Sequence, residues 1–190
     1  MRREPCFTGA MVELHRHFVR EQWGDEVLRM VLAALPSRDA DEIRNAHPIQ
    51  WVPLRAVEAF YEALARLLGE PVEDVHARVV RFSVAQRFRP IRRVLMRLAS
   101  DARLLGRASA LYRRTYNVGR LEARVTGAGR GELHLRSWPE VTDFALRGLR
   151  LGVGQLLEDA GRRQVSLTCQ RTDDGAVFTA SWASPALLQP

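Results

Sequence analysis

The sequence contains no lysine, so all 29 of its basic side chains are arginines. Its two cysteines, Cys6 and Cys169, are too few for a disulfide framework and favour a reducing, cytoplasmic environment. No apolar run reaches the ~20 residues that a membrane-spanning helix needs. The charged N-terminus also lacks the apolar core of a signal peptide. These absences predict a cytoplasmic protein without a membrane span.

Low-complexity tracts, internal repeats and long linkers are absent as well. With 46% hydrophobic residues, a chain of 190 residues can bury a core, as one domain or as one domain with a subdomain. The composition therefore predicts a globular protein and excludes a disordered one.

The positive charge is concentrated in one part of the chain. Residues 76–120 hold twelve arginines and a single acid, Asp101, so this segment carries a net charge of +11, against +7 for the whole chain. Such a belt is either the solvated face of arginine-rich helices or a site for an anion, such as a phosphate, a carboxylate or an acidic protein surface. Aromatic residues are few among these arginines and no helix-turn-helix spacing stands out, which argues against nucleic acid.

Apolar residues recur at helical spacing through the first part of the chain, and glycine or proline stops separate the segments. The pattern predicts helices at 7–22, 24–35, 37–46, 53–68, 71–88, 91–98 and 101–113.

After Tyr116 the apolar pattern changes from helical to alternating, which predicts strands. Two hairpins are expected, at 121–136 and 164–182, and the second has an Asp-Gly turn. Between them, Val141–Asp159 is predicted to be a helix buried on more than one side, with Ala145, Gly148 and Gly152 allowing a close backbone approach. The fold class is therefore α+β. Residues 1–115 form a helical N-terminal layer packed on a ββαββ antiparallel sheet unit, residues 116–190, in one compact domain.

The histidines and cysteines show no pattern typical of a metal site. His15 and His17 lie two residues apart on a predicted helix and point in different directions, and the other histidines are isolated. Cys169 alternates with the inward-facing Leu167, so we expect it in the core. No metal ion is predicted.

Catalytic motifs are also missing. The glycines at 127–131 resemble a dinucleotide fingerprint, but that motif must join a strand to a helix, and here a strand follows. No serine or cysteine has a surrounding nucleophile motif. The sequence predicts that this protein is not an enzyme.

The order of the predicted elements is similar to that of the haem nitric oxide/oxygen binding (H-NOX) superfamily, over nearly the whole chain. Tyr116-Asn-Val118-Gly-Arg120 resembles the Tyr-x-Ser-x-Arg motif with which that family holds the haem propionates. The helix through Arg147-Gly148-Leu149 and the last strand, ending in Phe178–Trp182, correspond in position. The resemblance implies an H-NOX-like fold and a sensory function.

Two departures from the H-NOX pattern bear on the cofactor. Val118 stands where the motif has serine. The family's haem-ligating histidine lies on a helix shortly upstream of the tyrosine, yet this chain has no histidine between His76 and His134. The chain is therefore similar to haem-free H-NOX-like proteins, such as an uncharacterised family abundant in myxobacteria, and no cofactor is predicted.

The leading hypothesis is a non-enzymatic bacterial signalling protein, a sensor or an adaptor, that binds a small apolar or anionic ligand, a protein partner or a second copy of itself. The expected ligand or anion site comprises Tyr116, Arg120, Arg113 and Arg114, at the mouth of a pocket between the helical layer and the sheet. Two alternatives remain open: a haem-based gas sensor with unusual ligation, and an arginine-rich nucleic-acid-binding protein.

Overall fold

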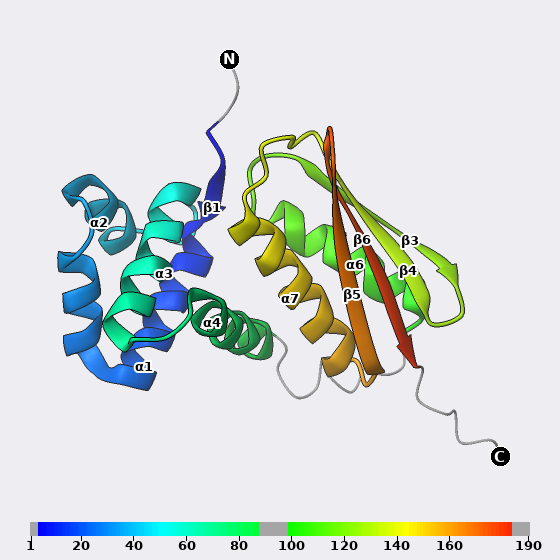
Figure 1. Cartoon of the computed structure of the whole chain (residues 1–190), viewed down its shortest axis with the longest axis horizontal. Helices are drawn as coiled ribbons and strands as arrows, with labels where there is room; N and C mark the ends of the chain where they lie inside the picture. The colour runs from blue at the N-terminus through cyan, green and yellow to red at the C-terminus, as the bar shows by residue number, and fades with distance from the viewer. Residues whose placement is uncertain (1–3, 88–98, 184–190) are drawn as a thin grey trace. The chain divides into compact units, whose positions relative to one another are not determined.

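The computed structural model describes residues 4–87 and 99–183 and divides the chain into two compact units (Figure 1). Unit 1 comprises Met1–Ser83 and Arg114–Val118, and unit 2 comprises Val84–Arg113 and Gly119–Pro190. The helix predicted at 91–98 lies outside the described residues.

Unit 1 is built from helices. They are α1 (Gly9–Ala33), α2 (Ser37–Arg44), α3 (Leu54–Leu68) and α4 (Val72–Arg87), the last of which ends in unit 2. The predicted break at Gly24 is confirmed, because Gly24 has a φ of 86° and interrupts the helical conformation within α1. Gly69 ends α3 in the left-handed conformation, with a φ of 66°. The apolar stripe of α3 forms the centre of the core, where Phe60, Tyr61 and Leu64 are fully buried.

A small two-stranded sheet, which the sequence did not predict, joins two separated segments of unit 1. Strands β1 (Cys6–Thr8) and β2 (Trp51–Pro53) pair antiparallel. Phe7 was expected to begin a helix, and this was wrong: three-residue strands are too short to show alternation. Gly9 then starts α1 directly against the backbone carbonyl of His47, where a side chain would not fit.

Unit 2 contains the ββαββ arrangement that the sequence predicted. Its elements are α6 (Asp101–Arg113), β3 (Arg120–Gly127), β4 (Arg130–Arg136), α7 (Asp143–Asp159), β5 (Arg163–Thr172) and β6 (Gly175–Ala183). The four strands are antiparallel in the order β3-β4-β6-β5. Helices α6 and α7 cover one face of this sheet, with α6 over β3 and α7 over β5 (Figure 1).

The alternation of the strands separates the two faces of the sheet as predicted. Leu121, Leu133 and Phe178 are buried beneath the helices, whereas Glu122 and Arg124 point to solvent. Cys169 departs from the pattern, since it is exposed instead of lying in the core. It lies on β5, an edge strand that pairs only with β6, so this strand is covered less than those in the centre.

The expected close packing of α7 is wrong at Gly152, whereas Ala145 is fully buried. A side chain added at Gly152 would meet nothing within 4 Å, and the buried residues of α7 form a single stripe: Ala145, Leu146, Val153, Leu156 and Leu157. The close approach occurs on β4 instead. There, Gly131 leaves room for the side chain of Leu105 and for the ring of Trp182, which lies 3.2 Å from where a Cβ would be.

Helix α6 belongs to unit 2, so the division of the chain does not coincide with the predicted boundary between residues 115 and 116. The reason is its apolar stripe: Leu104, Leu105, Ala108 and Tyr112 are buried, and the helix packs on β3. Helical periodicity shows that such a stripe exists but not which element it covers.

A buried ion pair fixes the N-terminus of α6 to the end of α7. The Arg162 guanidinium donates to Asp101 Oδ1 through Nη2 at 2.7 Å and through Nε at 3.1 Å. It also donates to the carbonyl oxygens of Ala99, at 2.8 Å, and Ala160, at 3.0 Å. The Arg162 side chain is only 6% exposed, so each of its donors needs these protein acceptors.

We predict that Asp101→Asn lowers the free energy of unfolding by about 3 kcal/mol, because it leaves the buried Arg162 charge without its counter-ion. Urea unfolding followed by circular dichroism measures this change. Glu122→Gln is the matched control: Glu122 pairs with Arg120 and Arg136 at the surface, so its loss should cost under about 1 kcal/mol. Equal effects of the two substitutions would contradict the role assigned to Arg162.

Candidate functional site

The four predicted site residues are divided between the units. Tyr116 and Arg114 lie in unit 1, whereas Arg113 and Arg120 lie in unit 2. The surroundings of each are therefore built up within its own unit.

The Tyr116 segment is attached to β1. Thr8 N donates to the carbonyl oxygen of Thr115 at 2.9 Å, and Phe7 and Tyr116 form an antiparallel bridge. The rings of Phe7 and Tyr116 meet edge to face, with their centroids 5.2 Å apart. Tyr116 is only 6% exposed, so its ring is part of the core of unit 1.

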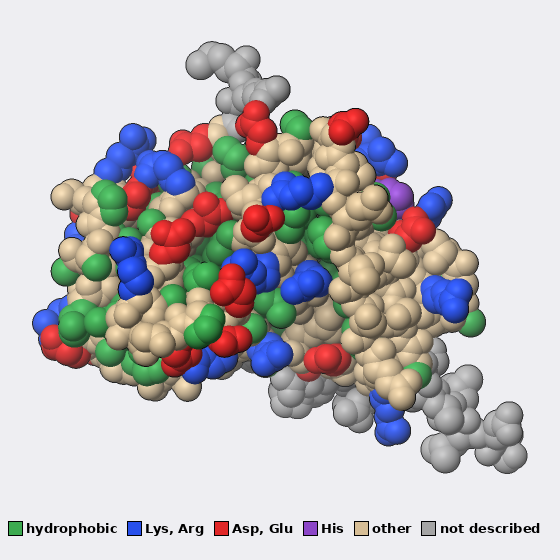
Figure 2. Space-filling view, viewed as in Figure 1, with side chains coloured by type: hydrophobic (Ala, Val, Ile, Leu, Met, Phe, Trp, Pro, Cys, Tyr) green, Lys and Arg blue, Asp and Glu red, His purple; other side chains and the backbone are tan. Residues whose placement is uncertain are grey.

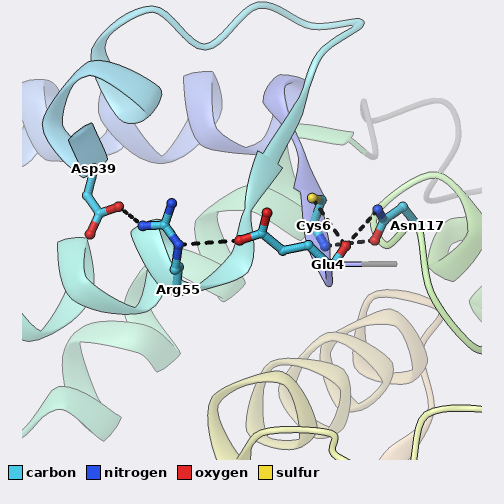
Figure 3. Close-up of polar contacts among 5 residues, drawn as sticks. All are labelled: Glu4, Cys6, Asp39, Arg55 and Asn117. Atoms are coloured by element: carbon cyan, nitrogen blue, oxygen red, sulfur yellow. Dashed lines mark hydrogen bonds and ion pairs between the residues drawn. The ribbon is translucent and has the colours of Figure 1, made fainter. Parts of the chain in front are cut away.

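Asn117 holds this attachment with its side chain and its backbone (Figure 3). Its Oδ1 accepts from Cys6 N at 2.7 Å, and its Nδ2 donates to the carbonyl oxygen of Glu4 at 3.1 Å. Its own backbone N–H donates to the carbonyl oxygen of Cys6 at 3.3 Å. The sequence analysis missed Asn117, because it occupies a variable position of the tyrosine motif and its partners lie more than 100 residues away.

A further ion-pair network extends from Glu4 (Figure 3). Arg55, on α3, donates to Glu4 Oε1 at 3.3 Å and also pairs with Asp39, on α2. Asp39 is 8% exposed, so Arg55 neutralises a carboxylate that is nearly buried. This network holds the segment preceding β1 against α2 and α3.

Two buried histidines pack around Tyr61 in the core of unit 1. The Tyr61 hydroxyl lies 3.0 Å from Nδ1 of His15, and the His76 ring centroid lies 4.9 Å from that of Tyr61. His15 and His76 are 3% and 2% exposed. Burial raises the pKa of the Tyr61 phenol, and Tyr116 raises it further. Burial likewise raises the pKa of Tyr116, with a smaller contribution from the charge of Glu58.

Arg120, the last residue of the motif, lies on the solvent face of β3. Its Nε is 3.1 Å from Glu122 Oε1, and Arg136 lies 3.4 Å from the other oxygen of that carboxylate. Gly119 sets the start of the strand with a φ of 67°, and a Cβ there would lie 2.8 Å from the Tyr112 hydroxyl. Arg120 is therefore 64% exposed and already has a carboxylate partner.

Arg113 and Arg114 are exposed. Within the part of the chain that the structure describes, neither side chain has a hydrogen bond or an ion pair. They are thus accessible cations, and no further described group of their own unit completes a site around them.

The described residues contain no grouping of three or more His, Cys, Asp or Glu that could hold a metal ion. A polar groove of about 350 Å³ lies in unit 2 beside the β5–β6 turn, lined by His134, Arg136, Asp173 and Asp174 among others. Asp174 there already accepts from Ser137 N at 2.9 Å. Over the face of the molecule in Figure 2, arginines and acidic side chains are interspersed. No helix of the described chain is long and apolar enough to cross a membrane.

The fold is that of H-NOX proteins. An Fe(II) unliganded H-NOX protein from K. algicida has 11% sequence identity and a TM-score of 0.67, and the match covers 96% of this chain and 100% of that one. An H-NOX protein from S. oneidensis in the Fe(II)NO state has 13% identity and a TM-score of 0.63, covering 92% and 98%.

An oxygen-binding H-NOX domain related to soluble guanylate cyclases gives 12% identity and a TM-score of 0.62, covering 96% of this chain and 98% of that domain. No protein-family model matches the sequence. A search of curated proteins found no match either. The chain therefore has an H-NOX-like fold, as its sequence predicted. At sequence identities of 11% to 13%, the comparison shows the fold alone.

The histidines and the motif residues that bear on a haem have the following surroundings. Of its five histidines, His15 is hydrogen-bonded to Tyr61 and His76 is buried against the same ring. Val118 has no hydroxyl to donate, and Arg120 pairs with Glu122.

We predict that alkaline pH destabilises the protein through its buried tyrosines. The folded state keeps Tyr61 and Tyr116 protonated, whereas an unfolded chain releases these protons near the ordinary pKa of 10.0. A raised folded-state pKa gives stability that is complete below pH 10 and is lost as the pH rises above it. Denaturant unfolding at several pH values should show this loss, and Tyr116→Phe should make it smaller.

The tyrosinate absorbance provides the control for this prediction. The chain has three tyrosines, which should titrate together near pH 10 when the protein is unfolded in urea. In the folded protein, at least two of them should titrate at higher pH. If all three titrate near pH 10 in the folded protein, Tyr61 and Tyr116 are not buried as described.

Proposed function

We propose that this protein is a non-enzymatic signalling module, a sensor or an adaptor, which has the H-NOX-like fold without its haem and acts by binding. Its partner is a protein or a small ligand, and its compartment is the bacterial cytoplasm, in keeping with its two free cysteines.

The observation that carries the proposal is the position of His76. It is the histidine that most nearly precedes the tyrosine motif, and its ring is buried and packs against Tyr61 of the same unit. An axial ligand must present a ring nitrogen to the iron. To do so, His76 would have to leave a packed core, which is costly for a buried aromatic ring.

The remains of the propionate motif support the same conclusion. Tyr116 keeps its residue type but packs against Phe7, where it contributes to the core. Arg120 also keeps its type, and its charge is shared with Glu122. Both side chains thus have structural roles that do not depend on a haem.

The proposal that the protein acts by binding, without catalysis, is supported by the distribution of reactive groups. Cys169 is exposed on an edge strand, but partial desolvation of its sulfur raises the pKa of the thiol, so its thiolate is disfavoured. The His134 imidazole pairs with Glu132, which is itself paired with Arg124 on the open face of the sheet. Among the described residues, these groups form no nucleophile–base pair.

Haem titration tests the proposal. We expect that the purified protein, mixed with one equivalent of haemin and reduced, shows no Soret band beyond that of free haemin, because no histidine is placed to ligate the iron. Apomyoglobin under the same conditions is the positive control.

A saturable one-to-one Soret band would overturn the haem-free proposal. His76→Ala would then show whether His76 is the ligand, with the exposed His17→Ala as its matched control. Loss of the band in the first variant only, and its recovery with added imidazole, would establish the alternative of a haem-based sensor.

A further inference from the structure

Helix α6 presents three arginines to solvent without counter-ions. Arg103, Arg107 and Arg113 are exposed, and their side chains have no ion pair with any residue in the ranges 4–87 and 99–183. About half of the exposed arginines elsewhere in the described structure do have one, among them Arg20, Arg29, Arg44, Arg124 and Arg171, whereas none of the three on α6 does. We call the three residues the α6 arginine face.

The one acid of α6 cannot neutralise this face. Asp101 is directed toward the other side of the helix, where it accepts two hydrogen bonds from the buried Arg162. The charge of Asp101 is therefore balanced by that of Arg162 inside unit 2. The α6 arginine face keeps its full positive charge, which favours an anionic partner.

The helix geometry gives the face a definite shape. With 3.6 residues per turn, Arg103 and Arg107 lie one above the other, and Arg113 lies about 80° from Arg103 around the helix axis, above Gly106. Ala102, Gly106 and Ala110 lie beside Arg103 and Arg107: Ala102 and Gly106 are exposed and Ala110 is half-buried. A side chain added at Gly106 would meet nothing within 4 Å. The face is thus a shallow strip of small residues with two cations along one edge and a third at its C-terminal end.

We propose that the α6 arginine face docks an acidic amphipathic helix of a protein partner. Glutamates or aspartates of such a helix, spaced to meet the edge and the C-terminal end of the strip, would form bidentate pairs with the guanidinium groups. The small residues of the strip would let its apolar stripe approach the α6 backbone closely. This inference rests on the proposed function, in that the protein acts by binding, and it names the surface and the chemistry of the partner.

Nucleic acid is the less suitable occupant of this face. Single strands are held by aromatic stacking, and duplex bases are read by arginine together with amide side chains. The exposed residues of α6 include no aromatic and no amide side chain, because Tyr112 is buried on the opposite side. The alanine–glycine strip instead offers the apolar contact that a protein helix needs.

Fluorescence anisotropy with a labelled, helical, glutamate-rich peptide tests the proposal. The spacing of the glutamates matches that of the three arginines, and a scrambled peptide of the same composition is the reference. We expect the matched peptide to bind the full-length protein with an affinity that falls as salt is added. The triple variant R103E/R107E/R113E should bind it at least about thirtyfold more weakly, because three attractive pairs become repulsive.

A variant with the same net charge is the control. Arg130, Arg150 and Arg163 are exposed arginines of unit 2 that also have no ion pair among the described residues, so R130E/R150E/R163E should weaken binding by less than about threefold. The milder R103Q/R107Q/R113Q, whose thermal unfolding should match that of the wild type, separates loss of binding from loss of folding.

Three results would overturn the proposal. They are no binding of the matched peptide, equal weakening by the two triple variants, and binding of a labelled DNA duplex in preference to the peptide at the same salt concentration. Each result leaves the haem titration unaffected, so the docking surface can fail while the haem-free binding module stands. A saturable Soret band, in contrast, would overturn the haem-free proposal and leave the docking surface standing.

Discussion

The ion pair between Arg162 and Asp101 is the interaction on which unit 2 most depends. It joins the first residue of α6 to the end of α7, so the two helices that cover the sheet are fixed to each other at one end. The pair also removes the single acid of the arginine-rich segment from the surface. A bond that stabilises the interior therefore decides the charge that the exterior presents.

The tyrosine motif, residues 116–120, lies where the chain passes from unit 1 to unit 2. Tyr116 and Asn117 attach the chain to β1 through a ring contact and three hydrogen bonds, and two residues further on Gly119 starts β3. Only glycine tolerates the left-handed conformation beside the Tyr112 hydroxyl. Tyr116 and Arg120 thus each have contacts within their own unit, with Phe7 and with Glu122.

The elements with strong local signals were predicted correctly, among them α3 with its apolar stripe, the four strands of the large sheet and α7 between the hairpins. The errors occurred where the outcome depends on distant partners. Strands β1 and β2 are too short to show a period, and Cys169 is exposed because β5 happens to be an edge strand. For the candidate site, the sequence indicated the residue types of Tyr116 and Arg120. It did not indicate Phe7, Asn117 and Glu122, because residues close in space can be far apart in the chain.

The sequence by itself determined where most helices and the strands of the large sheet lie, the concentration of arginine in residues 76–120 and the absence of a histidine just before the tyrosine motif. These properties follow from residue identity and from periods of 3.6 and 2, which are local. Only the tertiary structure decided that α6 packs on the sheet of unit 2, that Asp101 is bound to Arg162, and that His76 is enclosed against Tyr61. Burial and charge pairing depend on which surfaces meet, and that is a property of the whole folded chain.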